Sequence, residues 1–249
     1  MNSNVLSFPP ILTNCTNCRW SRACIARALD PNGLVELSRH ASHPGPLKQG
    51  AQLFRQGDKL EALFVLRSGS IKTYLDSEDG CEQSIAFLFP GDMVGFDAIA
   101  GNRHPTSAVA LETTAYCAIP YERVMSLAAK TPHLLQEVMR AAATHVMAAH
   151  SHVLLLGQKS APARLAAFLL DLSARFAVRG CSRTEFNLSM SRQEIANYLA
   201  VAVETISRLF TDLQHREVIA VDRRFVKILS LPALEAVARD AAPQRVRSA

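Results

Sequence analysis

The sequence lacks the features of a membrane or secreted protein. No apolar run in its 249 residues approaches the roughly 18 residues that span a bilayer. Residues 1–14 contain neither the basic stretch nor the apolar stretch of a secretory signal, and Pro9 and Pro10 interrupt their apolar residues. We therefore expect a cytoplasmic protein that has no membrane partner.

Charge is sparse, and its excess lies in one region. Charged residues make up 20% of the chain and hydrophobic residues 49%, which excludes a disordered or fibrous protein. Residues 1–158 carry 13 Lys and Arg against 13 Asp and Glu, whereas residues 159–249 carry 14 against 9. The whole net charge of +5 therefore lies in the last third, which is typical of a segment that binds a polyanion.

Three of the six cysteines, Cys15, Cys18 and Cys24, lie close together with the spacing C-x2-C-x5-C. In a cytosolic chain this group indicates metal or redox chemistry rather than a disulfide framework. Three soft thiolates suit an iron–sulfur cluster or zinc. Zinc sites usually add a second pair at C-x2-C spacing or histidines at matching spacing, and the sequence has neither. A four-iron cluster needs one further ligand.

The remaining cysteines are the candidates for that fourth ligand. Cys81 follows a predicted turn, Cys181 lies in a predicted loop of the basic last third, and Cys117 lies in a predicted strand. Judged by its position alone, Cys117 is more typical of a small buried side chain than of a ligand.

Short hydrophobic runs separated by glycines fill residues 47–120. The runs 63–66, 70–75, 84–89 and 108–119 recur at a spacing typical of strands in a sandwich or barrel. No helix-length segment separates them, so a parallel sheet with crossover helices is disfavoured.

A long helix is predicted from residue 132 to residue 156. Its apolar residues alternate in spacings of four and three, and we call them the seam: Leu135, Met139, Ala142, Val146, Ala149, Val153 and Leu156. This strict repeat is narrower than a face that packs on its own core usually needs, so it favours a coiled-coil dimer over an ordinary amphipathic helix. The flanking histidines, His145, His150 and His152, either repel across the dimer when protonated or face solvent.

Two short helices are predicted at residues 192–199 and 203–214. Ser191 is a good N-cap for the first, with Glu194 placed to complete a capping box. Ala200 lies in the turn between the helices, where glycine is common. The apolar residues expected to hold the pair together are Ile195, Leu199, Ile206 and Leu209.

A hairpin with a basic tip follows the two helices. Its strands, residues 218–221 and 225–229, complete a winged helix-turn-helix, whose second helix enters the DNA major groove. The alternative is a solvated helix face on which Glu204 pairs with Arg208. The expected DNA-binding residues are Arg192, Glu204, Thr205, Ser207, Arg208, Arg223 and Arg224.

The order of these parts resembles the Crp/Fnr superfamily of bacterial transcription regulators, and its oxygen-sensing Fnr branch in particular. Four stretches read like that branch: residues 91–99 (GDMVGFDAI), 110–113 (ALET), 164–168 (RLAAF) and 203–209 (VETISRL). The resemblance implies an α+β fold in four parts. These are a cysteine arm (1–28), an antiparallel, cupin-like β-roll sensory domain (29–130), a long dimerisation helix (131–158) and a winged helix-turn-helix domain (159–249).

The resemblance also implies a cofactor and a function. In the Fnr branch, three N-terminal cysteines and one in the strand after ALET bind a [4Fe–4S] cluster, which implies Cys15, Cys18, Cys24 and Cys117 here. Base-reading residues of the branch match Glu204, Ser207 and Arg208. The chain is then not an enzyme but an oxygen-responsive regulator of anaerobic metabolism. Its homodimer would read an inverted repeat of TTGAT-type half-sites and act with RNA polymerase.

Two departures from the superfamily pattern stand out. Cyclic-nucleotide members carry an Arg-Ser phosphate cradle, whereas residues 104–108 here offer Thr106 and Ser107 without an arginine, so cyclic nucleotide binding is not expected. Near Gly80, in the loop that approaches RNA polymerase in the family, Cys81 replaces the usual acidic residue. Two alternatives stay open: a cluster-bearing redox or electron-transfer protein, and a regulator of the same fold with zinc or a thiol switch.

Overall fold

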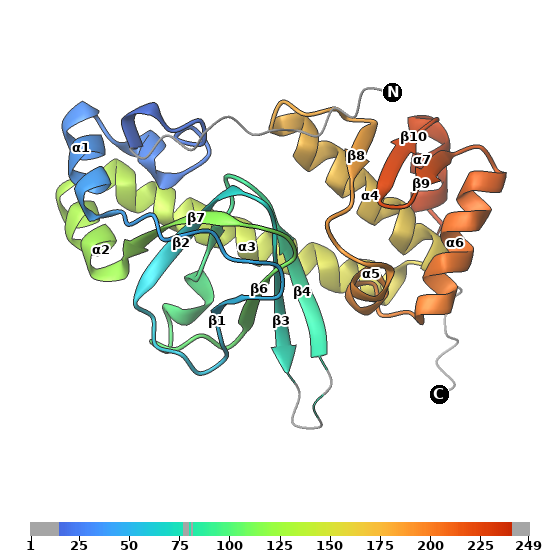
Figure 1. Cartoon of the computed structure of the whole chain (residues 1–249), viewed down its shortest axis with the longest axis horizontal. Coiled ribbons are helices and arrows are strands. Elements are labelled where there is room, and N and C mark those ends of the chain that lie inside the picture. Colours follow the sequence, from blue (N-terminus) through green and yellow to red (C-terminus); the bar gives the residue numbers. More distant parts are fainter. Residues whose placement is uncertain (1–14, 77–79, 81, 241–249) are drawn as a thin grey trace, which may run out of the picture. The chain divides into compact units, whose positions relative to one another are not determined.

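The computed structural model describes residues 15–76, 80 and 82–240 (Figure 1). The chain divides into two compact units, Met1–Val146 and Met147–Ala249, so the division falls within the long helix. Each unit is described separately below. In the described ranges, no helix combines the length and hydropathy needed to cross a membrane.

The first unit begins with short helices that precede the β-roll. Two 3-10 helices, η1 (Cys15–Asn17) and η2 (Ile25–Ala28), lead into helix α1 (Pro31–His40). Asp30 is the N-cap of α1, because its carboxylate accepts a hydrogen bond of 2.7 Å from the backbone N–H of Gly33. The sequence patterns did not predict this helix.

Seven strands form two antiparallel sheets, which confirms the β-roll prediction (Figure 1). One sheet has the order β1-β6-β3-β4 and the other has the order β5-β2-β7. Leu63, Leu66 and Ile71 are completely buried in the core of the roll. The strands are β1 (Gln52–Phe54), β2 (Ala62–Ser68), β3 (Ile71–Asp76), β4 (Glu82–Leu88), β5 (Met93–Val94), β6 (Ser107–Ala110) and β7 (Ala115–Pro120).

The hydrophobic run 108–119 is two strands rather than one. β6 pairs with β3 and β7 pairs with β2, so the chain passes from one sheet to the other between them. Thr114 stabilises this crossing: its hydroxyl accepts from the Ser70 N–H at 3.1 Å and contacts the carbonyls of Ser70 and Glu112. Hydrophobicity alone does not reveal the break, because residues on both sides of it are buried.

The unit ends with α2 (Tyr121–Lys130) and the first half of α3 (Pro132–Gln158). Leu134 and Val138 of α3 are 0% and 5% exposed, and they share a hydrophobic core with Ile25 of the arm. The helix therefore packs one face on its own unit, and Ala142 of the seam also packs against this core.

The second unit is a winged helix-turn-helix, as expected from the sequence (Figure 1). Both hydrogen bonds of the predicted capping box form, between Ser191 and Glu194 at 2.6 and 3.2 Å. A three-stranded antiparallel sheet of order β8-β10-β9 makes the wing. The elements are α4 (Ala161–Val178), β8 (Glu185–Asn187), α5 (Arg192–Tyr198), α6 (Val203–His215), β9 (Ile219–Asp222), β10 (Phe225–Ile228) and α7 (Leu231–Ala238).

The four apolar residues expected to hold α5 and α6 together differ in burial. Ile195, Leu199 and Ile206 are completely buried, whereas Leu209 is half-buried. Phe210 takes the next buried place on α6, at 3% exposure, because positions four residues apart lie on one face of a helix.

Candidate metal centre and DNA interface

The structure brings Cys15, Cys18, Cys24 and Cys117 together. Cys15 lies in η1, Cys24 directly precedes η2, and Cys117 lies in the middle of β7. Each of the six pairs that these four thiols form interacts electrostatically. Cys24 and Cys117 are buried and share one hydrophobic core, whereas Cys15 and Cys18 are half-buried.

Burial controls the acidity of these thiols. It raises the pKa of Cys24 and of Cys117 to about 12 each, and it raises the pKa of Cys15 as well. Desolvation disfavours the charged thiolate, and neighbouring thiolates add to the effect. The thiols of Cys15, Cys24 and Cys117 therefore keep their protons more readily than free cysteines, unless a metal ion replaces the protons.

Trp20 attaches the cysteine loop to the β-roll. Its indole N–H donates to the Arg67 carbonyl of β2 at 2.8 Å, and its ring packs against the turn at Gly91. A Cβ at residue 91 would lie 3.3 Å from the Trp20 ring and 3.0 Å from the Ala23 Cβ, and the backbone there has a φ of +93°. Glycine therefore permits this close approach.

A cation and an imidazole lie beside Cys117. The Arg67 guanidinium donates to His43 Nδ1 at 3.3 Å, and Cys117 Sγ lies 3.3 Å from the same nitrogen. Because a guanidinium only donates, Nδ1 is the acceptor and the imidazole proton is on Nε2. Arg67 is 8% exposed and attracts the thiolate forms of Cys15 and Cys117. Its guanidinium therefore favours negative charge on these two sulfurs.

The four thiols fit an iron–sulfur cluster in donor type and number. Such a cluster requires four soft ligands, and these four are within electrostatic reach of one another. As bare thiols they are not arranged as a finished site: among the residues that the structure describes, no group of three or more His, Cys, Asp or Glu could hold a metal ion.

The other two cysteines are not part of this group. Cys181 lies in the second unit, in the turn after α4, where its N–H donates to the Phe176 carbonyl at 3.0 Å. Cys81 lies outside the described residues.

The stretch that matches a phosphate cradle is occupied by internal contacts. His104 is 2% exposed, its ring stacks on Phe54 with centroids 3.7 Å apart, and its Nδ1 lies 3.2 Å from the Asp97 carboxylate. The Thr106 hydroxyl donates to the same carboxylate, and the Ser107 hydroxyl accepts from the Gln56 N–H. Burial acts to raise the pKa of Asp97, but the hydrogen bonds with His104 and Thr106 outweigh it, so the pKa is lowered. A phosphate at this position would face an anion.

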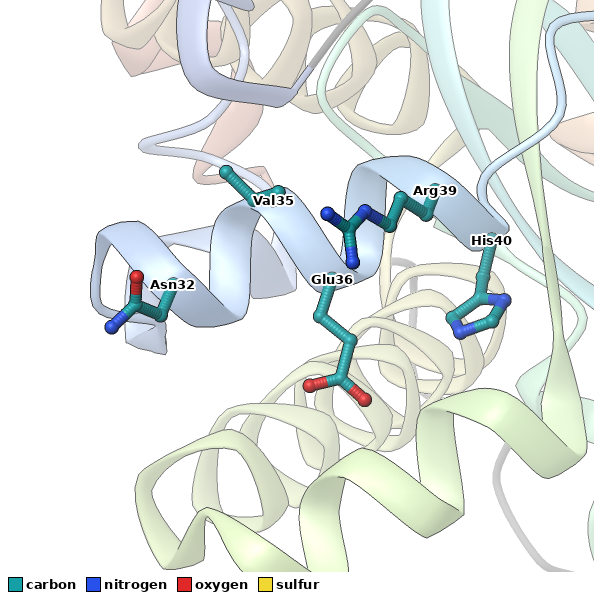
Figure 2. A pocket seen from close by; sticks show the side chains of 5 residues that line it. All are labelled: Asn32, Val35, Glu36, Arg39 and His40. Carbon is teal, nitrogen blue, oxygen red and sulfur yellow. The ribbon is translucent and has the colours of Figure 1, made fainter.

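A surface hollow on the first unit does not overlap the cysteines. It has a volume of about 460 Å³ and lies along α1, where Figure 2 shows the polar side chains of Asn32, Glu36, Arg39 and His40 around Val35. The side chains in Figure 2 extend along one helix and do not converge on a point.

The seam is exposed in the single chain. Met139 and Val153 are 64% and 69% exposed, and Leu135 and Val146 are also exposed although their side chains are large and apolar. Ala149 is exposed, and Ala142 and Leu156 are half-buried. Helix α3 therefore has features of both predicted types of helix. Leu134 and Val138 pack on the core of the first unit, as in an ordinary amphipathic helix, and the seam is a second apolar face, as in a coiled coil.

Two of the three histidines beside the seam have partners within the chain. The His145 ring packs against the Phe96 ring with centroids 5.5 Å apart. His152 Nε2 lies 2.9 Å from the Tyr198 carbonyl, and the two rings are 4.0 Å apart. Of the three, only His150 is exposed. His145 and His152 therefore do not simply face solvent, whereas repulsion across a dimer stays a prediction.

The first turns of α6 present the expected recognition residues. Glu204, Ser207 and Arg208 are exposed, and Thr205 is half-buried. Ser207 also donates to the Val203 carbonyl of its own helix at 3.1 Å, so its hydroxyl oxygen remains able to accept.

The remaining basic candidates surround α6. The Arg192 guanidinium lies 3.4 Å from the centre of the Phe210 ring, and partial burial lowers its pKa. Arg223 is exposed at the tip of the wing, and Arg224 donates to the Ser189 carbonyl at 3.2 Å. Arg192 and Arg224 thus have structural contacts, whereas Arg223 extends from a backbone with a φ of +55°.

Sequence reasoning missed Arg67, His43 and Arg164. Arg67 and His43 lie far from the cysteine motif along the chain and reach Cys117 only through folding. Arg164 belongs to the RLAAF stretch, but nothing in the neighbouring sequence reveals that its guanidinium contacts four backbone carbonyls. An arginine within the otherwise apolar first half of the helix, residues 161–170, is the one available signal.

Two protein families match separate parts of the chain. The cyclic nucleotide-binding domain family matches residues 45–131. The Crp-like helix-turn-helix domain family matches residues 163–237.

Similar proteins of known name cover most of the chain. The fumarate and nitrate reduction regulatory protein of Vibrio cholerae is 44% identical over 217 residues, 87% of each chain. The protein of the same name from Escherichia coli is 42% identical over 225 residues, 90% of each chain. The solved structure of FixK2 from Bradyrhizobium japonicum has a TM-score of 0.74 at 26% identity and covers 82% of this chain and 99% of its own.

Proposed function

Because the chain belongs to the Crp/Fnr family of transcription regulators, we propose that it is an oxygen-responsive member that binds a [4Fe–4S] cluster when oxygen is absent. The chain is a transcription regulator with a DNA-binding helix-turn-helix domain and is not an enzyme. The finer proposal adds that the cluster-bearing form dimerises, binds an inverted repeat, and activates or represses genes of anaerobic metabolism. The grouping of all four cysteines is the observation that carries it.

Cys15, Cys18, Cys24 and Cys117 would hold the cluster. When bound, the cluster supplies the oxygen-sensitive chemistry. The protein contributes a mostly apolar surrounding and the buried Arg67 guanidinium, which favours the thiolate forms. Ordering of the arm by its three cysteines also orders Ile25, and Ile25 shares a core with Leu134 and Val138 of α3. A conformational change in the arm can therefore affect the long helix, because the two share one continuous hydrophobic core.

The seam supports a homodimer as the DNA-binding form. Large apolar side chains at strict heptad spacing are rarely left exposed on a monomer, and a second copy of α3 would cover them. A two-fold dimer then presents two recognition helices to half-sites about one helical turn apart.

Base reading is assigned to Glu204, Ser207 and Arg208, with Thr205 beside them. Arg208 is exposed and can donate two hydrogen bonds to guanine, and Glu204 can accept from cytosine. Arg223 at the wing tip suits a phosphate contact that carries no sequence information. Arg192 and Arg224 add positive charge near α6. Arg192 also packs on the Phe210 ring, and Arg224 also donates to the Ser189 carbonyl. RNA polymerase is the partner proposed for activation.

The internal network at Asp97 argues against a cyclic nucleotide as the effector. Its carboxylate already accepts a hydrogen bond from the Thr106 hydroxyl and contacts the His104 ring, in the stretch where a phosphate cradle would be needed. We propose that the matched cyclic nucleotide-binding domain is retained as a scaffold for the cysteine site.

A regulator with zinc or a thiol switch is the second candidate, because four thiols also suit zinc. Purification without oxygen, an absorption spectrum, and iron, sulfide and zinc quantitation distinguish the candidates. We expect about four irons and four sulfides per chain, and loss of binding to an inverted repeat when air is admitted. Stoichiometric zinc, or unchanged DNA binding in air with no iron present, would refute the oxygen-sensing proposal. An electron-transfer protein would show a cluster whose loss leaves DNA binding unaffected.

A further inference from the structure

The turn before the recognition helix needs hydrogen-bond donors from outside itself. Helix α5 has seven residues, and the last carbonyls of a helix have no donor within the helix. The carbonyls of residues 195–197 accept from the N–H groups of residues 199–201. The next three carbonyls, those of Tyr198, Leu199 and Ala200, accept from side chains of other helices.

Those donors are His152 of α3 and Arg164 of α4. His152 Nε2 lies 2.9 Å from the Tyr198 carbonyl, and it must carry the proton because a carbonyl only accepts. Arg164 Nη1 donates to the Leu199 carbonyl at 3.0 Å and lies 3.5 Å from the Ala200 carbonyl. The His152 and Tyr198 rings also pack against each other.

The same guanidinium holds the end of the long helix. Arg164 Nη2 donates to the Leu156 carbonyl at 2.6 Å, and its Nε donates to the Lys159 carbonyl at 3.0 Å. One planar group thus connects the C-terminal end of α3 to the turn between α5 and α6. A lysine could not replace it, because an ammonium is a point donor without the rigid fork of a guanidinium.

The turn has little conformational support of its own. Ala200 has a φ of +51°, a left-handed conformation that disfavours residues with a Cβ. Its geometry therefore depends on the bonds it accepts. The recognition helix begins at Val203, three residues later, so a change in the turn changes where α6 starts.

We propose that Arg164 and His152 are positioning residues for DNA reading, which fix the recognition helix relative to the end of α3. They form a joint that sets the placement of Arg208 without contacting DNA. Base contacts depend on placement within a fraction of an ångström, whereas phosphate attraction depends mainly on charge. The joint should therefore govern specificity more than general affinity. This inference rests on DNA binding by the family and not on the cluster.

The test measures dissociation constants of the full chain for an inverted repeat of TTGAT half-sites and for a random duplex at one salt concentration. Arg164→Lys preserves charge but removes the fork. We expect at least about tenfold weaker binding to the repeat, with less than about twofold change on random DNA. The matched control is Arg175→Lys on the same helix, whose pairing with Asp171 a lysine can reproduce, and it should match the wild type on both duplexes.

His152→Phe keeps a ring against Tyr198 and removes the donor, so it tests the joint with little loss of packing. We expect a smaller loss of specificity than for Arg164→Lys, and a double variant whose loss is less than the product of the two single losses. A wild-type ratio of specific to random affinity in Arg164→Lys would overturn the proposal. So would an equal loss on both duplexes with a lowered melting temperature, which indicates a merely structural role. Strictly multiplicative losses would show that the two residues do not form one joint.

Discussion

The Arg27 guanidinium donates to the Glu137 carboxylate at 2.7 Å and ties the segment after Cys24 to helix α3. The other carboxylate oxygen of Glu137 accepts from Arg140 Nε at 2.8 Å. Glu137 is the last carboxylate before Asp171, so this link uses the only acidic side chain on α3. It adds a polar contact to the apolar core that the arm shares with α3.

Removal of this link should loosen the arm. Arg27→Met should lower the free energy of unfolding by roughly 0.5–1 kcal/mol, because Arg27 is partly exposed and the pair is screened by solvent. Backbone amides of η2 should exchange with deuterium faster in the variant. Arg22→Met, at an exposed position of the same arm, is the control. Equal exchange in both variants would show that the apolar core alone holds the arm.

The same pair predicts a pH dependence. The hydrogen bond from Arg27, followed by that from Arg140, holds the pKa of Glu137 below its ordinary value of 4.5, although burial opposes this. The folded pKa lies below the unfolded one, so the stabilisation is fully present above about pH 4.5 and is lost as the pH falls through the folded value. Over that acidic range, the free energy of unfolding of the metal-free protein should fall less in Glu137→Gln than in the wild type. Parallel curves would contradict the assignment.

The fourth ligand is tested by paired cysteine variants. Cys117→Ser should abolish iron and sulfide incorporation and DNA binding in cells, because the arm alone supplies three thiols. Cys181→Ser and Cys81→Ser should retain both properties. A cluster that survives in Cys117→Ser and is lost in Cys181→Ser would replace the proposed ligand set.

Ala200→Gly should stabilise the second unit. Glycine adopts a φ of +51° without the steric cost of a Cβ. The free energy of unfolding of the second unit, measured by thermal melting, should therefore rise by about 1 kcal/mol. Ala236→Gly provides the opposite control, because this exposed residue lies within α7 and glycine there should cost about 0.5–1 kcal/mol. A loss of stability in both variants would show that the turn tolerates alanine without strain.

Arg208 and Arg223 should differ in what they recognise. Arg208→Ala should cost about 1–3 kcal/mol on the inverted repeat and relax discrimination at one base pair. Arg223→Ala should weaken binding to all sequences alike and flatten the salt dependence of the affinity. Titrations of specific and random duplexes at several salt concentrations distinguish the two effects. An equal loss on both duplexes for Arg208→Ala would contradict its role in base reading.

Local patterns in the sequence determined much of this protein. The C-x2-C-x5-C group, the Ser191 capping box and the heptad repeat of the seam each involve residues within one or two turns of one another. Such patterns reflect backbone geometry that repeats every few residues, so they can be read without knowledge of the fold. The resemblance to a family then added Cys117, which its own position did not favour.

Tertiary structure alone decided which distant residues meet. Cys117 joins the arm because β7 pairs with β2 and carries its sulfur into the core that also contains Cys24. His152 contacts the Tyr198 carbonyl, and α3 covers its own unit mainly with Leu134 and Val138. These outcomes depend on strand pairing, on the angle at which helices pack and on which buried carbonyls still need a donor. Contacts of this kind join residues tens of positions apart, and no short-range periodicity encodes them.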